Sequence, residues 1–331
     1  MTLEVIAEAS PNGALRSFGA FVPSIDGEGR VAFQATRSDG ATRVLFGDGS
    51  AIDTLACDGP HADHEVVSHP VITPRGIAWI GRRGTNDALL FHDGSRVEAL
   101  VDNTYPGIDA IGPLGPTSDD RGTIAVRASW HGRPAVVVLR DGLVDVWTDG
   151  TLPRMAGLPL LSEGDLVVRA DDVRGRNVVI RVRGREESVL LATGKQLASI
   201  GSFPCVDGAR IACGVRRADG TEALVEVLPD PQHQHVILEA GADFSSLRGV
   251  LVAGEHTVFY ATPHGGELAV YVLGREPKRI VGLGQKLDGS RVSDLALNPV
   301  SIHRAGWLAI RLALEDGRER IVRVALEPLE R

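Results

Sequence analysis

The sequence predicts an all-β protein that folds as a single seven-bladed β-propeller, with the last blade closed by the N-terminal strand. Three observations predict this fold: one strand motif recurs seven times, its copies are evenly spaced, and the two chain ends supply complementary parts of one blade. A chain of 331 residues, of which 43% are hydrophobic, can bury the core of such a ring. Repetitive β architectures often fill this length as one cooperative body.

The motif that recurs is the apolar second strand of each repeat. Its seven copies are RVAFQA from Arg30, GIAWIG from Gly76, TIAVRA from Thr123, DLVVRA from Asp165, RIACGV from Arg210, TVFYAT from Thr257 and WLAIRL from Trp307. The first apolar residue of each copy follows that of the previous copy by 42 to 50 residues. A period of this length accommodates four short strands with their turns, which is the unit of a propeller blade.

The chemistry of the turns and of the fourth strand agrees with this period. Asp-Gly pairs, which favour tight hairpin reversals, fall between apolar runs at 39–40, 93–94, 141–142, 219–220 and 316–317. A fourth strand is readable in six repeats, as IDTLAC from Ile52, VEALVD from Val97, VDVWTD from Val144, ESVLLA from Glu187, HVILEA from His235 and KRIVGL from Lys278. We expect one domain, residues 1–331, with blades at about 10–57, 58–102, 103–148, 149–193, 194–240, 241–283 and 284–327.

The seventh repeat lacks a fourth strand of its own. After WLAIRLALEDG the chain runs through RERIVRVALE, whereas the N-terminus supplies a spare strand of the matching type, LEVIAEA. We expect residues 2–8 to pair with the strand near Ile321 to Ala325 and so to close the ring. Closure removes the exposed edge of an open array, so a folded monomer is expected.

One copy of the repeat carries a family resemblance. The segment FVPSIDGEGRVAFQA from Phe21 resembles the bacterial tandem-repeat proteins described by the pattern NxxGxxAF, with Asp26 where that pattern has Asn. Later copies, such as LLSEGDLVVRA, keep only the spacing. The resemblance implies a propeller fold and implies no reaction.

The composition limits which cellular compartment and which classes of binding partner are expected for this chain. A formal charge of −8 argues against a nucleic-acid-binding surface, and no apolar run is long enough to span a membrane. The N-terminus, MTLEVIAEAS, has no basic region followed by a long apolar stretch, so we expect a cytoplasmic protein. Cys57, Cys205 and Cys213 have no metal-ribbon spacing, which suits a reducing compartment, and the last two are expected to be buried thiols.

A ligand site is expected at one end of the propeller axis. There the loops that lead into each innermost strand meet the loops between the second and third strands, and this face is rich in Arg and His. The expected ligand-binding residues are Arg16, Arg82, Trp130, Arg154, Arg216 and Arg291. Guanidinium groups in an acidic protein would attract an anionic small ligand, a carboxylate or a phosphate. The alternative is that these arginines are solvated or paired with neighbouring acids.

Histidines on the same face are candidates for acid-base catalysis, because imidazole titrates near neutral pH. The candidates are His64, His69, His131 and His264. His69 precedes a proline in an inner strand and is expected nearest the channel, with a hydrogen-bonded core histidine as the alternative.

The segment CDGPHADHEVVSH concentrates three histidines that a divalent metal could use. His61, His64 and His69 would be its ligands, and a polar loop without metal is the alternative. Neither HExxH nor CxxC accompanies them, and no other cofactor is predicted.

Three further arginines recur at the same place in the second strand, namely Arg127, Arg169 and Arg311. Salt bridges between blades would explain this recurrence as well as ligand binding would, and we favour the structural role.

These features predict a small-molecule-processing enzyme. It would bind a polar or anionic metabolite at the channel mouth and use His and Arg for non-redox acid-base chemistry, as a lyase, isomerase, cyclase or hydrolase does. The alternative is a non-catalytic propeller that serves as a protein-interaction or ligand-binding module. No Walker loop, GxSxG elbow, kinase motif or dinucleotide fingerprint is present to support other chemistry.

Overall fold

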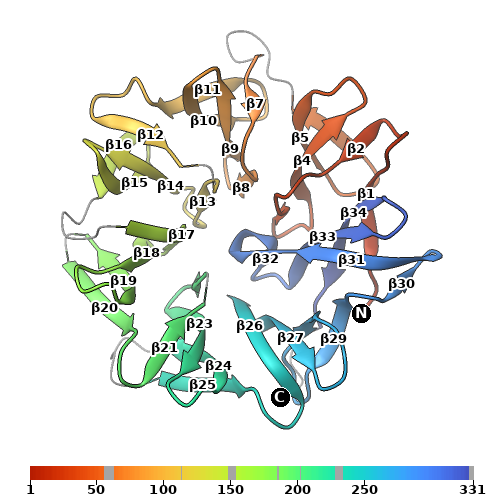
Figure 1. Ribbon diagram of the computed structural model, residues 1–331. Helices are drawn as coiled ribbons and strands as arrows, with labels where there is room; N and C mark the ends of the chain where they lie inside the picture. Colours follow the sequence, from red (N-terminus) through yellow and green to blue (C-terminus); the bar gives the residue numbers. More distant parts are fainter. Residues whose placement is uncertain are drawn as a thin grey trace.

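The computed structural model describes residues 1–55, 63–112, 114–147, 154–184, 186–201, 203–227 and 234–327. These residues form seven antiparallel sheets arranged around a central axis, which confirms the predicted seven-bladed β-propeller (Figure 1). Within these ranges one short 3-10 helix, Pro299–Ser301, is the only helical element. None of the described segments forms a helix with the length and apolar character needed to cross a membrane.

The first four blades follow one another along the chain. Blade one contains β2 (Leu15–Ser17), β3 (Ser24–Ile25), β4 (Val31–Arg37), β5 (Thr42–Gly47) and β6 (Ile52–Leu55). Blade two contains β7 (Glu65–Val66), β8 (Val71–Thr73), β9 (Gly76–Arg83), β10 (Asn86–His92) and β11 (Val97–Asp102). Blade three contains β12 (Ile108–Ile111), β13 (Thr117–Ser118), β14 (Ile124–Trp130), β15 (Arg133–Arg140) and β16 (Leu143–Trp147). Blade four contains β17 (Arg154–Ser162), β18 (Asp165–Asp171), β19 (Asn177–Arg183) and β20 (Glu186–Ala192).

The remaining three blades complete the ring. Blade five contains β21 (Leu197–Ile200), β22 (Cys205–Asp207), β23 (Arg210–Arg217), β24 (Glu222–Val227) and β25 (Gln234–Glu239). Blade six contains β26 (Phe244–Ala253), β27 (His256–Pro263), β28 (Ala269–Val272) and β29 (Lys278–Gly282). Blade seven contains β30 (Lys286–Leu287), β31 (Ser290–Ala296), β32 (Ile302–His303), β33 (Trp307–Leu314), β34 (Glu319–Ala325) and β1 (Glu4–Ala9).

The innermost strand of most blades is split into two segments. In blade one, β2 and β3 both pair with β4, at its two ends, and blades two, three, five and seven have the same arrangement. Blades four and six keep one continuous inner strand, in which the register shifts between Ala156 and Leu160 or between Leu247 and Gly249. In every blade the inner strand ends in a turn at the same end of the axis, and residues of these strand ends and turns line a cavity there.

The recurring second strand forms the core of each blade, as predicted. Its apolar anchor residue is at most 5% exposed in all seven blades, at Val31, Ile77, Ile124, Leu166, Ile211, Val258 and Leu308. The strand alternates sides, so apolar residues on both of its faces pack against the neighbouring blades, as with the fully buried Phe33 and Trp79. Each repeat of the motif therefore corresponds to one blade, and its buried second strand packs against the neighbouring blades.

The two ends of the chain meet in blade seven. β1 is the outermost strand of this blade and pairs antiparallel with β34, with Val5 opposite Val322 and Ala9 opposite Glu319. Arg323 on β34 donates two hydrogen bonds to the carboxylate of Glu4, of 2.7 and 2.8 Å. The predicted closure by the N-terminal strand is confirmed.

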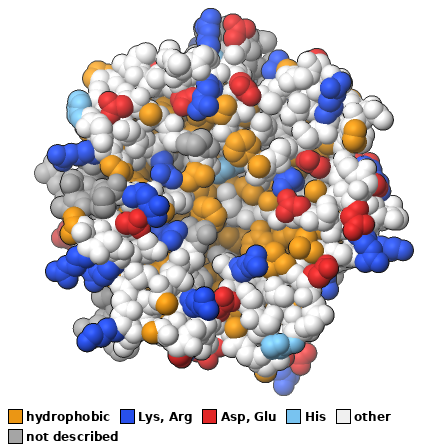
Figure 2. Space-filling model, viewed as in Figure 1, with side chains coloured by type: hydrophobic (Ala, Val, Ile, Leu, Met, Phe, Trp, Pro, Cys, Tyr) orange, Lys and Arg blue, Asp and Glu red, His pale blue; other side chains and the backbone are white. Residues whose placement is uncertain are grey.

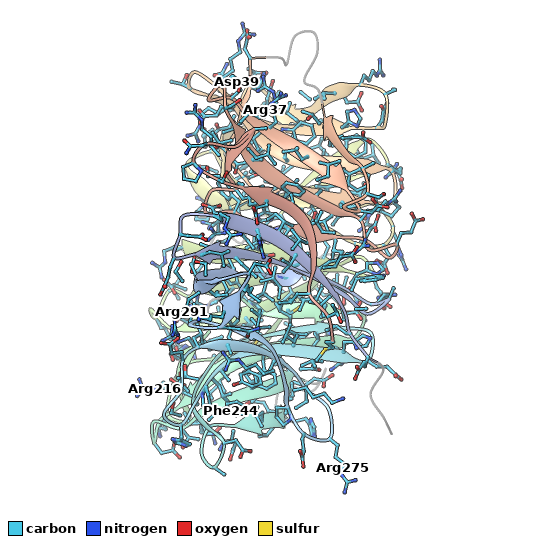
Figure 3. All side chains as sticks on the ribbon, turned by 90° about the vertical axis from the view of Figure 1, so that its right-hand side faces the viewer. Arg37, Asp39, Arg216, Phe244, Arg275 and Arg291 are labelled. Carbon is cyan, nitrogen blue, oxygen red and sulfur yellow. The ribbon has the colours of Figure 1, made fainter. Side chains whose placement is uncertain are left out.

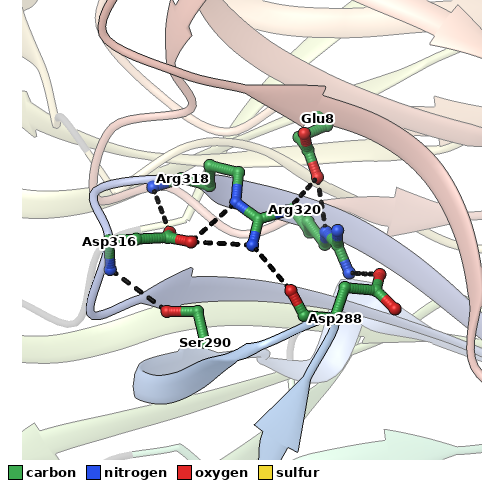
Figure 4. Close-up of polar contacts among 6 residues, drawn as sticks. All are labelled: Glu8, Asp288, Ser290, Asp316, Arg318 and Arg320. Carbon is green, nitrogen blue, oxygen red and sulfur yellow. Dashed lines mark hydrogen bonds and ion pairs between the residues drawn. The ribbon is translucent and has the colours of Figure 1, made fainter.

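An ion-pair cluster also joins the N-terminal strand to blade seven (Figure 4). The guanidinium of Arg320 donates to Glu8 on β1 at 2.7 Å and to Asp288 at 2.6 Å, although the Arg320 side chain is only 8% exposed. Arg318 contacts Asp316 at 2.7 Å and Glu8 at 3.5 Å. Because the buried Arg320 would lose one of its two carboxylate partners without Glu8, this cluster helps to hold β1 against β34.

Candidate functional site

The two faces of the propeller differ in the turns that form them. The inner-turn face is made by the turns between each innermost strand and the second strand, such as residues 26–30 in blade one. The opposite face is made by the turns between the second and third strands. Figure 3 shows the disc from its edge, with Arg216 and Arg291 on the opposite face and Arg275 on the inner-turn face.

The inner-turn face holds a cavity of about 480 Å³ on the propeller axis. All seven blades line it, through the ends of their inner strands and the turns that follow. Its charged lining consists of six carboxylates against three arginines and one histidine: Asp26, Glu28, Asp119, Asp120, Glu163 and Asp207, then Arg30, Arg121, Arg304 and His303. A cavity of this size suits a small molecule, and the balance of charge is negative.

The inner turn of blade one, residues 26–30, is held by the side chain of Asp26. The Oδ1 atom of Asp26 accepts hydrogen bonds from the backbone N–H groups of Glu28 and Arg30, both at 2.9 Å. Its Oδ2 atom accepts a hydrogen bond of 2.8 Å from Nε of Arg30. Both carboxylate oxygens of Asp26 are therefore used inside the turn.

The inner turn of blade three, residues 119–123, begins with the equivalent aspartate but differs from the turn of blade one at three of its other positions. The Oδ1 atom of Asp119 accepts hydrogen bonds from the backbone of Arg121 at 3.0 Å and of Thr123 at 2.9 Å. Thr123 stands where blade one has Arg30, and Oδ2 of Asp119 has no hydrogen-bond partner among the described residues. Asp119 is 7% exposed and lines the cavity, so a buried carboxylate oxygen remains unused there.

A second unpartnered polar atom lies beside the same cavity. Ser24, on β3, is 1% exposed, and its Oγ atom has no hydrogen-bond partner among the described residues. A buried polar group without a partner costs about 1 to 3 kcal/mol. A polar ligand or ordered water that satisfied Ser24 and Asp119 would remove this cost.

Arg304 crosses the mouth of the cavity. It leaves the inner turn of blade seven and contacts Oδ2 of Asp120 in blade three at 2.9 Å and Oδ1 of Asp207 in blade five at 2.5 Å. The hydrogen bond to Asp207 raises the pKa of Arg304 above its ordinary value. The other oxygen of Asp207 accepts a hydrogen bond of 2.5 Å from the backbone of Gly254.

His303 is the histidine that lines this cavity, and it was not among the site residues predicted from the sequence. Its Nδ1 atom accepts a hydrogen bond of 3.1 Å from the backbone N–H of Ala305, so the neutral ring carries its proton on Nε2. Burial lowers the pKa of His303, against the opposing influence of Asp120 and Asp26. Its ring packs against Gly27, where a Cβ atom would lie 2.9 Å from Cε1.

The ligand-binding residues predicted from the sequence do not line this cavity. Four of the arginines already have partners: Arg82 pairs with Asp87, Arg154 with Asp171, and Arg216 and Arg291 donate to the backbone carbonyls of Gly220 and Gly284. Arg16 is exposed on β2, and Trp130 contacts His131 edge to face. Figure 2 shows the opposite face, where apolar side chains gather around the centre and charged side chains are spread from beside this centre to the rim. An anion site there stays a prediction.

His69 lies in the interior between blades two and three. It is 3% exposed, and its Nε2 atom lies 3.1 Å from the carbonyl oxygen of Pro116. Burial lowers the pKa of His69 to about 4, although the hydrogen bond to Pro116 opposes the shift. The ring packs against Gly115, whose φ of +93° and close approach favour glycine. These contacts favour the core histidine that the sequence left as an alternative.

The other predicted histidines occupy separate places. His64 is half-buried and lines a smaller hollow of about 310 Å³ with Arg43, Asp63 and Glu65. His131 lies in a tight turn at φ +47°, and its backbone N–H donates to Gly107. His264 is exposed, with Nε2 2.5 Å from the carbonyl oxygen of Gly241. Their catalytic roles stay predictions.

The structure describes only part of the predicted metal site. Of the three predicted ligands, His61 lies outside the described residues, whereas His64 and His69 lie within them. Cys57, which was not a predicted ligand, also lies outside the described residues. In the described ranges no group of three or more His, Cys, Asp or Glu side chains is arranged to hold a metal ion. Cys205 and Cys213 are buried, as expected, and burial raises the pKa of each thiol to about 12.

The three recurrent arginines have contacts that favour a structural role. Arg127 reaches blade four, where it donates to the carbonyl oxygen of Met155 at 3.0 Å. Arg169 donates to Asn177 and Arg311 to Asp294 within their own blades. Of the three, Arg127 is therefore the one with a described contact to the next blade, and this contact is a hydrogen bond instead of the expected salt bridge.

Comparison with known proteins shows the fold. No protein-family model matches the chain and no curated protein matches it, so the resemblance to NxxGxxAF proteins depends on the quoted motif alone. Among solved structures, a puromycin-hydrolysing peptidase from Mycobacterium tuberculosis is 17% identical with a TM-score of 0.62, over 98% of this chain and 54% of that one. Prolyl oligopeptidase B from Galerina marginata is 11% identical with a TM-score of 0.59, over 96% and 50% of the two chains.

A chain of a mitotic checkpoint complex is 12% identical with a TM-score of 0.54, over 97% of this chain and 94% of that one. The present chain therefore spans about half the length of the two peptidases but almost the full length of the checkpoint chain. At these identities the likeness is one of architecture. It shows that the chain has a propeller scaffold of a kind found in both catalytic and interacting proteins.

Proposed function

We propose that this propeller binds a small polar molecule carrying a positive charge in the axial cavity of the inner-turn face. The observation that carries the proposal is Asp119, a carboxylate that is 7% exposed, lines the cavity and has an oxygen without a hydrogen-bond partner among the described residues. A cationic group would compensate the buried charge and supply the missing donor.

The balance of charge supports a cation over the anion that the sequence suggested. Six carboxylates line the cavity, and two of its three arginines, Arg30 and Arg304, are already paired with carboxylates of the same lining. An anion would enter an excess of negative charge, whereas a cation would reduce it. The rigid blades hold these groups in place whether the bound molecule is converted or only retained.

Replacing Asp119 should weaken the binding of a cationic probe. Asp119→Asn keeps the oxygen that accepts the two backbone hydrogen bonds but replaces Oδ2 by an uncharged amide. Because a hydrogen bond to a charged group contributes about 1.5 to 3 kcal/mol, the dissociation constant for agmatine should rise about tenfold or more. Isothermal titration calorimetry at low salt measures this change.

Asp26→Asn is the matched control, since Asp26 occupies the equivalent turn and both its oxygens are used there. It removes the same charge from the lining but no unpartnered oxygen, so it should raise the dissociation constant clearly less than Asp119→Asn does. Equal losses in the two variants, or binding of citrate in preference to agmatine and putrescine, would contradict the proposal.

A further inference from the structure

One positively charged side chain of the protein already occupies the mouth of the cavity. The guanidinium of Arg304, from blade seven, contacts a carboxylate oxygen of Asp120 in blade three and one of Asp207 in blade five. These three blades are not neighbours in the ring, so the side chain spans the opening. Both carboxylates line the same cavity as Asp119.

The two carboxylates are placed to receive a cation. The Asp207 side chain is 18% exposed, and its Oδ2 atom is held by the backbone N–H of Gly254, which leaves Oδ1 to Arg304. Asp120 is more open, with its side chain 61% exposed. A planar guanidinium can contact two carboxylates at once, and Arg304 forms ion pairs with both Asp120 and Asp207.

Arg304 is also placed to leave. Its side chain is 44% exposed, and ion pairs with this much exposure are individually weak. Asp120 belongs to the inner turn of blade three and Asp207 to the end of strand β22, whereas the guanidinium lies at the end of a long flexible side chain. Movement of Arg304 would therefore open the site without moving the backbone.

We infer that Arg304 is an internal occupant of a cation subsite formed by Asp120 and Asp207, and that the guanidinium or ammonium group of a ligand binds there by displacing it. This inference rests on the proposed function, because it concerns the same cavity. When a competing group fills a subsite, the apparent association constant of a ligand is its intrinsic value multiplied by the fraction of molecules in which the subsite is free. Arg304 therefore lowers the apparent affinity of any cationic ligand that must displace it from the subsite.

Removing Arg304 should tighten the binding of agmatine, which carries a guanidinium and an ammonium group. From the usual strength of two part-exposed ion pairs, Arg304→Ala should lower the dissociation constant about five- to tenfold in titration calorimetry. Arg304→Gln, which keeps most of the side-chain volume, should act in the same direction. Differential scanning calorimetry checks that both variants are folded.

Arg121→Ala is the matched control. Arg121 lines the same cavity, and none of the ion pairs among the described residues involves it. Its removal changes the charge of the cavity by the same amount but frees no subsite, so agmatine binding should tighten clearly less than in Arg304→Ala. Adding Asp120→Asn to Arg304→Ala should abolish most of the gain.

The outcomes separate the two proposals. If Arg304→Ala weakens agmatine binding, or if Arg304→Ala and Arg121→Ala tighten it equally, Arg304 is not an internal occupant and the inference is overturned. If agmatine binding depends on Asp119 but not on Arg304, only this inference fails. If neither the native protein nor Arg304→Ala binds agmatine or putrescine, the proposed function fails with it.

Discussion

A protein that lacks residues 2–9 is expected to lose the cooperative unfolding transition of the complete chain. These residues contain β1, the outermost strand of blade seven, and Ile6, Ala7 and Ala9 on it are 4%, 6% and 0% exposed. Their removal exposes apolar surface, breaks the pairing with β34 and leaves an unpaired strand edge. Together these losses should reduce the free energy of unfolding by at least about 5 kcal/mol. Differential scanning calorimetry measures the effect.

Two neighbouring residues of β1 provide a test with a matched control. Ile6 is 4% exposed and packs in the core between blade seven and blade one, whereas Val5 is 43% exposed on the other side of the strand. Ile6→Asp should cost about 3 to 5 kcal/mol because it buries a charge in place of an apolar side chain. Val5→Asp should cost less than about 1 kcal/mol. If the two variants lost similar free energies of unfolding, or if the truncated protein melted like the complete one, pairing of β1 with β34 would not be what stabilises the closed ring.

The fold could be predicted because each blade repeats its own local pattern. Val31 in blade one and Leu308 in blade seven occupy the same place in the motif, and both are 0% exposed. The closure could be predicted because the missing strand and the spare strand lie at the two ends of one sequence. In both cases the information is carried by the type and spacing of residues close in sequence.

The cavity could not be predicted in this way, because its walls come from turns that are distant along the chain. Asp120 and Arg304 meet only through the curvature of the ring. Aspartates in such turns are also ordinary turn-forming residues, and Asp26 accepts backbone hydrogen bonds in its turn as Asp119 does. The distinctive feature of Asp119 is that Thr123 replaces an arginine four residues later, a signal that has meaning only once the hydrogen bonds of the two turns are compared.

Acidification is expected to destabilise the fold through His69. Burial holds the pKa of His69 at about 4 in the native state, against an ordinary value of 6.5. The unfolded chain therefore takes up the proton more readily than the native protein does. The full stability is present above pH 6.5 and is lost as the pH falls from 6.5 towards 4. Between pH 7.5 and 5.0, His69 alone should lower the free energy of unfolding by about 2 kcal/mol.

His69→Gln isolates this contribution. A glutamine amide can donate to the carbonyl oxygen of Pro116, as Nε2 of His69 does, but it does not titrate. Urea unfolding at pH 7.5 and 5.0 should show that the variant loses about 2 kcal/mol less than the native protein between the two conditions. His264→Gln, which removes an exposed histidine, should leave the native difference unchanged. If the free energy of unfolding of His69→Gln fell between pH 7.5 and 5.0 by as much as that of the native protein, other groups would cause the acid sensitivity. Burial between the blades would then not keep His69 from taking up a proton in the native state.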